Sequence, residues 1–132
     1  MSINKSRIIS LVATAYADGF FDIEELDYIN KKAEKLEIDK GELLKIIQNP
    51  HINNPVYPTL EIEKLEFMYD IMELMLADTV IKDSETIIFN SYLQKLGYEG
   101  NHDEIRRKMK LSVEDKKSFV DFQEKYFPKY EN

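Results

Sequence analysis

The side chains best suited to a chemical role in this sequence are acidic, and they occur in two equally spaced pairs. Asp18 follows an apolar segment and is itself followed by Glu25, and Asp78 and Glu85 repeat this spacing 60 residues later. Carboxylate pairs bind hard cations, serve in proton transfer, or accept hydrogen bonds from the free N–H groups that open a helix. The structural elements around the two acidic turns decide between these roles.

Other common chemistries lack the residues that they need. The chain has no Cys and only two His, which excludes thiol catalysis, disulfides and Cys-based zinc sites and argues against a multi-His metal site. It contains no P-loop, dinucleotide-binding glycine motif, nucleophile elbow or zinc-protease motif. We therefore expect that the protein is not an enzyme.

The charge of the chain bears on its partners. The 25 acidic residues outnumber the 18 Lys and Arg, which gives a formal net charge of −7. Nucleic-acid binding depends on clustered cations, so no nucleic-acid partner is expected, whereas cations and basic proteins suit an acidic surface. No stretch approaches the ~20 apolar residues that cross a bilayer, and no secretory signal opens the chain. These features predict a cytoplasmic protein without direct membrane insertion.

Helices are expected to carry the acidic residues. Apolar residues recur at helical spacing along the chain without an alternating strand pattern, which predicts an all-α fold of about seven helices. Asp22 is expected to cap one helix with Glu25 at its third position, and Asp39 to cap the next. Ser112 is expected to cap the last helix. The proline-rich segment 50–58 cannot continue a helix and separates two halves.

The predicted helix from Thr59 to Ala77 is apolar on nearly every side, so we expect it to be central and mostly buried. Glu66, Asp70 and Glu73 form its polar stripe. We interpret this stripe as the face that reaches water rather than as an acidic groove.

The two halves repeat each other within a single domain, 1–132. Each half is predicted as helix, acidic turn, helix, helix, over residues 3–49 and 59–111, and a C-terminal helix at 113–127 is an addition. Two such repeats are expected to pack about a pseudo-two-fold axis, which would relate the two acidic turns. The matched residues are Asp18 with Asp78, Glu25 with Glu85, Asn30 with Asn90 and, after a two-residue slip, Glu42-Leu43 with Glu104-Ile105.

The first acidic turn, Leu11–Glu25, resembles the signature of the tellurite-resistance TerB family: an apolar helix ending in Ala-Asp-Gly, a short turn, and Glu early in the next helix. The segment Met75–Glu85 is similar to the family's second copy and departs from the first at Thr79, where Gly19 stands in the first. The resemblance covers roughly residues 3–111. It implies an all-helical cytoplasmic bacterial domain of tellurite and chemical-stress resistance that works beside membrane-associated and calcium-binding proteins.

Carried over by position, the resemblance implies metal ligands at Asp18, Glu25, Asp78 and Glu85. Asp18 and Asp78 each end a predicted helix, where a carboxylate opposes the helix dipole at a cost of about 0.3–1 kcal/mol. A divalent cation would compensate, and oxygen ligands favour Ca²⁺ or Mg²⁺ over zinc. The alternative is local hydrogen bonding to free helix amides, which needs no cofactor.

Two functions follow from these alternatives. The first is a non-enzymatic, TerB-like module of the stress response that binds a divalent cation at the twin acidic turns and contacts other proteins. The second is a protein-interaction or scaffold domain whose acidic turns are structural caps and bind no metal.

Overall fold

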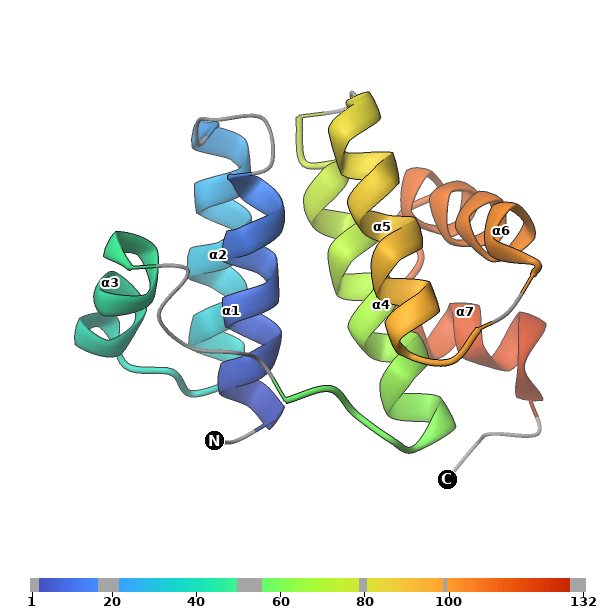
Figure 1. Ribbon diagram of the computed structural model, residues 1–132, viewed down its shortest axis with the longest axis horizontal. Coiled ribbons are helices and arrows are strands. Elements are labelled where there is room, and N and C mark those ends of the chain that lie inside the picture. The colour runs from blue at the N-terminus through green and yellow to red at the C-terminus, as the bar shows by residue number, and fades with distance from the viewer. Residues whose placement is uncertain (1–2, 17–21, 50–55, 79–80, 99, 129–132) are drawn as a thin grey trace.

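The computed structural model describes residues 3–16, 22–49, 56–78, 81–98 and 100–128, so Asp18 and residues 50–55 lie outside the described ranges. These ranges form seven helices and no strand, which confirms the all-α prediction (Figure 1). None of these helices is both long enough and apolar enough to cross a membrane. The helices are α1 (Ile3–Ala15), α2 (Ile23–Lys35), α3 (Lys40–Gln48), α4 (Glu61–Met75), α5 (Asp83–Lys95), α6 (His102–Glu114) and α7 (Phe119–Tyr126).

Two helical hairpins, α1–α2 and α4–α5, stand side by side, with α3 outside the first and α6 and α7 outside the second (Figure 1). The contact between α1 and α4 joins them, and α4 also packs against α2, α5, α6 and α7. Most of α4 is buried, as predicted for a central helix. The arrangement brings the starts of α2 and α5, which follow the two acidic turns, to the same end of the molecule.

The two hairpins share details of their helix ends. The first residues of α2 and α5, Ile23 and Asp83, lie 60 positions apart, as do their last residues. Both helices end in a Schellman turn with a left-handed residue, Glu37 at φ 60° and Gly97 at φ 94°. The defining hydrogen bonds run from the Ile38 N–H to the Ala33 carbonyl (2.9 Å) and from the Tyr98 N–H to the Leu93 carbonyl (3.0 Å). The pseudo-two-fold axis and the domain bounds stay predictions.

The structure confirms one predicted helix cap and corrects another. Asp39 caps α3, where its side chain accepts a hydrogen bond from the Gly41 N–H at 2.8 Å. Asp22 precedes α2 but makes no side-chain capping bond, so the predicted capping box at this position is wrong. The carboxylate of Asp22 instead binds the ammonium group of Lys82 on the other hairpin.

The C-terminal helix α7 is held by Tyr69 of α4. The Tyr69 hydroxyl donates to the Lys117 carbonyl at 2.7 Å, so the Ser112 hydroxyl is the donor in the 2.8 Å bond between Ser112 and Tyr69. The Tyr69 ring packs against Phe119 and Phe122. The prediction that Ser112 caps the last helix is wrong, because this residue is buried within α6 and the last helix begins only at Phe119.

Candidate functional site

Three of the four predicted ligands meet at the junction of the hairpins, whereas Asp18 lies outside the described residues. Glu25 is in the first turn of α2 and Glu85 in the first turn of α5, and their exposed fractions are only 1% and 2%. Asp78 follows the end of α4. All three lie beside Lys82, the residue that precedes α5.

The Lys82 ammonium group lies between carboxylates of both hairpins. Three carboxylate oxygens surround its Nζ atom, Asp22 Oδ2 at 3.0 Å, Asp78 Oδ2 at 3.6 Å and Glu25 Oε1 at 3.9 Å. The main-chain N–H of Lys82 donates to Glu85 Oε1 at 3.0 Å. Lys82 therefore holds the position that a bound cation would take among these carboxylates. We call these five residues the acidic cluster.

Glu25 and Glu85, which the sequence repeat relates, form a buried carboxyl pair. Burial and the hydrogen bond to Glu85 raise the pKa of Glu25 to about 8, and burial also raises the pKa of Glu85. Two buried carboxyls in contact favour sharing one proton over both ionising, and the hydrogen bond between them has Glu25 as the donor and Glu85 as the acceptor. The other Glu25 oxygen, Oε1, has no hydrogen-bond partner among the described residues.

The hydrogen bond from Lys82 keeps the pKa of Asp22 below its ordinary value, and a hydrogen bond with Asp78 acts in the same direction. Asp22 is therefore ionised at neutral pH. The acidic cluster places four carboxyl groups against the single cation Lys82, so negative charge remains in excess even where two carboxyls share a proton. This excess of negative charge attracts cations.

The donor chemistry of the acidic cluster fits a hard cation. Its acceptors are carboxylate oxygens, which suit Ca²⁺ and Mg²⁺. One of them, the buried Glu25 Oε1 atom, receives no hydrogen bond from the described residues. However, no three acidic or histidine side chains of the described residues are arranged to hold a metal ion. Cation binding would therefore need these carboxylate side chains to move closer together, in the space where the Lys82 ammonium now lies.

A second buried ionic cluster connects α1, α2 and α4. Arg7 Nε donates to Asp70 Oδ2 at 2.7 Å, and Lys32 Nζ lies 3.2 Å from Asp70 Oδ1. The Tyr28 hydroxyl donates to Glu73 at 2.7 Å, and burial raises the pKa of Tyr28. The interpretation of the acidic stripe on α4 as a water-facing surface is wrong for Asp70, whose exposed fraction is only 3%. Its charge can be buried because two cations from neighbouring helices neutralise it. This cluster is internally paired and holds the hairpins together.

The sequence interpretation missed Lys82 and Arg7 as members of these clusters. Lys82 stands 60 positions after Asp22, so equivalent positions of the repeat carry opposite charges. This was an available signal for an ion pair across the junction. Arg7 shares the apolar face of its helix with Leu11, a place where a cation needs a buried acidic partner.

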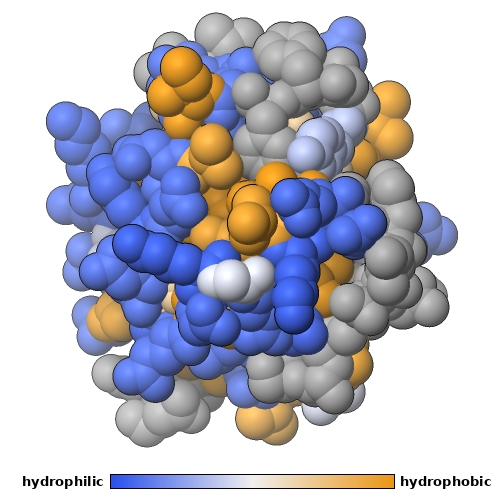
Figure 2. Space-filling model, turned by 90° about the vertical axis from the view of Figure 1, so that its left-hand side faces the viewer, coloured by the Kyte–Doolittle hydropathy of each residue, from blue (hydrophilic) through white to orange (hydrophobic). Residues whose placement is uncertain are grey.

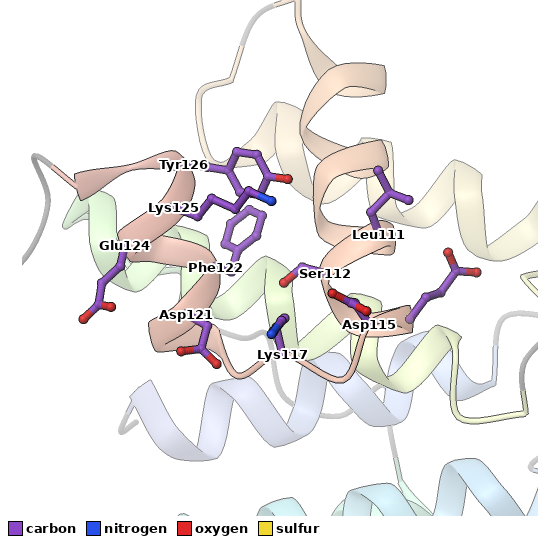
Figure 3. Close-up of a pocket in the computed structure, with 10 residues that line it drawn as sticks. Leu111, Ser112, Asp115, Lys117, Asp121, Phe122, Glu124, Lys125 and Tyr126 are labelled. Carbon is purple, nitrogen blue, oxygen red and sulfur yellow. The ribbon is translucent and has the colours of Figure 1, made fainter.

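A pocket of about 870 Å³ lies between α6 and α7 (Figure 3). Figure 3 shows Phe122 and Tyr126 of α7 on one side of it, across from Leu111 and Ser112 of α6. Its rim carries both signs of charge, and the buried Ser112 hydroxyl is already bonded to Tyr69. These walls select no particular ligand chemistry, so the acidic cluster is the stronger candidate site.

Comparison with known protein families, curated proteins and solved structures found no match for this chain. The resemblance to the TerB family therefore rests on the motif residues alone, and the chemistry of the site has to be argued from the contacts of the chain itself.

Proposed function

We propose that the protein is a non-enzymatic, TerB-like module that binds a divalent cation, Ca²⁺ or Mg²⁺, at the acidic cluster. In this proposal it acts in the cytoplasm, in a bacterial chemical-stress response, through contacts with other proteins that include membrane-associated components. The repeated Ala-Asp and Glu motif supports the family. The observation that carries the cation site is the buried Glu25 carboxyl, which leaves one oxygen without a hydrogen-bond partner beside Glu85.

The chain's own residues set the conditions for binding. Glu25, Asp78 and Glu85 would hold the ion, which would supply the positive charge that Lys82 now supplies. Lys82 would turn toward solvent, to which a quarter of its side chain is already exposed. Glu25 would lose its proton, because carboxylate ligands bind metal in the deprotonated form. Affinity for the cation should therefore increase as the pH rises toward 8 and above.

Replacing Lys82 with Met should strengthen cation binding. The ammonium group lies within 4 Å of three carboxylate oxygens and competes with an incoming ion for them. Removing one charge at this distance near the protein surface is worth roughly 1–4 kcal/mol, which corresponds to an affinity that is higher by about fivefold or more. Isothermal titration of the wild type and Lys82→Met with Ca²⁺, Mg²⁺, Mn²⁺ and Zn²⁺ measures this change. Zn²⁺ is expected to bind more weakly than Ca²⁺ or Mg²⁺.

The matched control is Lys31→Met. Lys31 also pairs with one carboxylate, Asp27, but on the exposed face of α2, so its replacement should leave cation affinity unchanged. If neither the wild type nor Lys82→Met produces heat or a shift in melting temperature at millimolar ion, the protein binds no divalent cation and this part of the proposal is wrong.

A protein-interaction domain with structural acidic turns is the second candidate function. It is favoured by the contacts of Lys82, which already supply a partner to Asp22, Asp78 and Glu85. On this alternative, Asp78→Asn lowers the melting temperature equally with and without Ca²⁺ or Mg²⁺. Cation binding instead predicts that the stabilisation by added ion is reduced in Asp78→Asn. Thermal melts in EDTA and in millimolar ion distinguish the two outcomes.

A further inference from the structure

An apolar groove of about 780 Å³ runs between α2 and α3. Ala33 and Leu43 are buried in its floor, while Leu44 leaves 54% of its surface exposed to solvent. The helix α3 packs on α1, and the groove lies between α3 and α2. Figure 2 looks onto this side of the molecule, where hydrophobic residues lie in the middle of a hydrophilic surface. We call this feature the α2–α3 groove.

In the matching place of the second half, a hydrogen bond joins α6 to α5. By the sequence repeat, Leu44 corresponds to Arg106, and Asn30 corresponds to Asn90. Arg106 Nη1 donates to Asn90 Oδ1 at 3.0 Å, which ties α6 to α5. Leu44 cannot make this bond, so nothing equivalent draws α3 onto α2. The exposed apolar groove is therefore a difference between the halves and does not follow from their shared architecture.

The rim of the α2–α3 groove is acidic. Glu34, Glu37 and Asp39 border it, against the single cation Lys40. Among the described residues, Glu34 and Glu37 have no ion-pair partner, so their charges face solvent unneutralised. Their counterparts in the second half are uncharged, namely Gln94 and Gly97.

We propose that the α2–α3 groove docks an amphipathic helix of another protein, with a large apolar side chain against Leu43 and Leu44 and with Lys or Arg facing Glu34 and Glu37. Apolar helix faces fill grooves of this kind, and the acidic rim selects basic flanks. A second copy of this chain is a poor occupant, because its net charge of −7 would repel the rim.

This inference rests on the proposed function only in that contacts with other proteins belong to it. Glu34 lies nine residues after Glu25 on the same helix, which places the groove roughly 13 Å along α2 from the acidic cluster. Docking at the groove therefore needs no bound cation, and the two proposals can fail separately.

The probe is a fluorescein-labelled, designed amphipathic peptide of about 18 residues, or five helical turns, with Leu on one face and Lys on both flanks. Its binding to the full chain is measured by fluorescence anisotropy in EDTA. Leu44→Arg, which copies Arg106 of the second half, should weaken binding at least tenfold. The double variant Glu34→Gln, Glu37→Gln should also weaken it, with the larger effect at low salt, because exposed charges are screened by salt.

The control variant is Arg106→Leu, which should leave the affinity unchanged because Gln94 and Gly97, the counterparts of Glu34 and Glu37, carry no charge to attract a basic flank. A control peptide with Glu in place of Lys should bind at least tenfold more weakly. The proposal is overturned if neither the Leu peptide nor its Phe and Met versions bind. It is also overturned if Leu44→Arg, shown by circular dichroism to be folded, binds the peptide as tightly as the wild type does. Equal binding of the Lys peptide and the Glu control peptide would overturn it as well. A wild-type dimer that Leu44→Arg dissociates, detected by sedimentation, would also overturn it in favour of self-association.

Discussion

Replacing Asp70 with Asn should lower the free energy of unfolding by about 3–5 kcal/mol, the range for removing one partner of a buried ion pair. The Asp70 carboxylate is 3% exposed and accepts a hydrogen bond from Arg7 while pairing with Lys32. An amide of the same shape keeps an acceptor but loses the charge. Arg7 and Lys32 then keep only their longer ion pairs, with Glu66 at 3.7 Å and with Glu73 at 3.6 Å. Urea unfolding followed by circular dichroism measures the loss.

Glu66→Gln provides the control for this measurement. Glu66 pairs with the same residue, Arg7, but at 3.7 Å and with 42% of its side chain exposed. Exposed ion pairs contribute at most about 1 kcal/mol, so this variant should remain close to the wild type. A loss in Asp70→Asn no larger than that in Glu66→Gln would show that the cluster on α4 is not what holds the hairpins together.

The wild type should become less stable as the pH rises from about 5 to above 8, and Glu25→Gln should remove most of this loss. An unperturbed glutamate titrates at 4.5, whereas the pKa of Glu25 in the fold is about 8. Between these values the folded chain retains a proton that the unfolded chain has released, so the free energy of unfolding falls with increasing pH. Glutamine keeps a hydrogen-bond donor toward Glu85 but does not titrate. Melting temperatures across this pH range test the expectation.

Glu24→Gln is the matched control, because Glu24 lies in the same turn of α2 but is exposed. Its pH profile should follow that of the wild type. If Glu25→Gln retains the wild-type decline, the proton is held elsewhere and the carboxyl pair at the junction is not the titrating group. EDTA in all samples keeps adventitious ions out of this comparison.

The helical architecture could be predicted because its signals are local. The apolar spacing of α4 identified a central helix, and the bounds of α2 and α5 agree with the 60-residue repeat. The error at Ser112 has a tertiary cause. A serine at a helix start and a serine buried within a helix look alike in sequence, and the partner that decides between them, Tyr69, lies 43 residues away.

The candidate site could be predicted in part from the sequence repeat. The repeat relates Glu25 to Glu85, and the structure brings these two residues together. The contacts of Lys82 and Arg7 could not be read from helical spacing, because each pairs with an acidic residue about 60 positions away in the chain. Which charges meet across two hairpins depends on how the hairpins pack, and a single periodic pattern carries no information on that packing.

The left-handed residues that end α2 and α5 give the two halves different local stability. Glycine adopts this conformation freely, whereas a residue with a Cβ atom is strained there by about 1–2 kcal/mol. Gly97 ends α5 without strain, but Glu37 ends α2 at φ 60°. The last turn of α2 should therefore fray more readily than the last turn of α5. This gives the wall of the α2–α3 groove room to adjust to helices of different width.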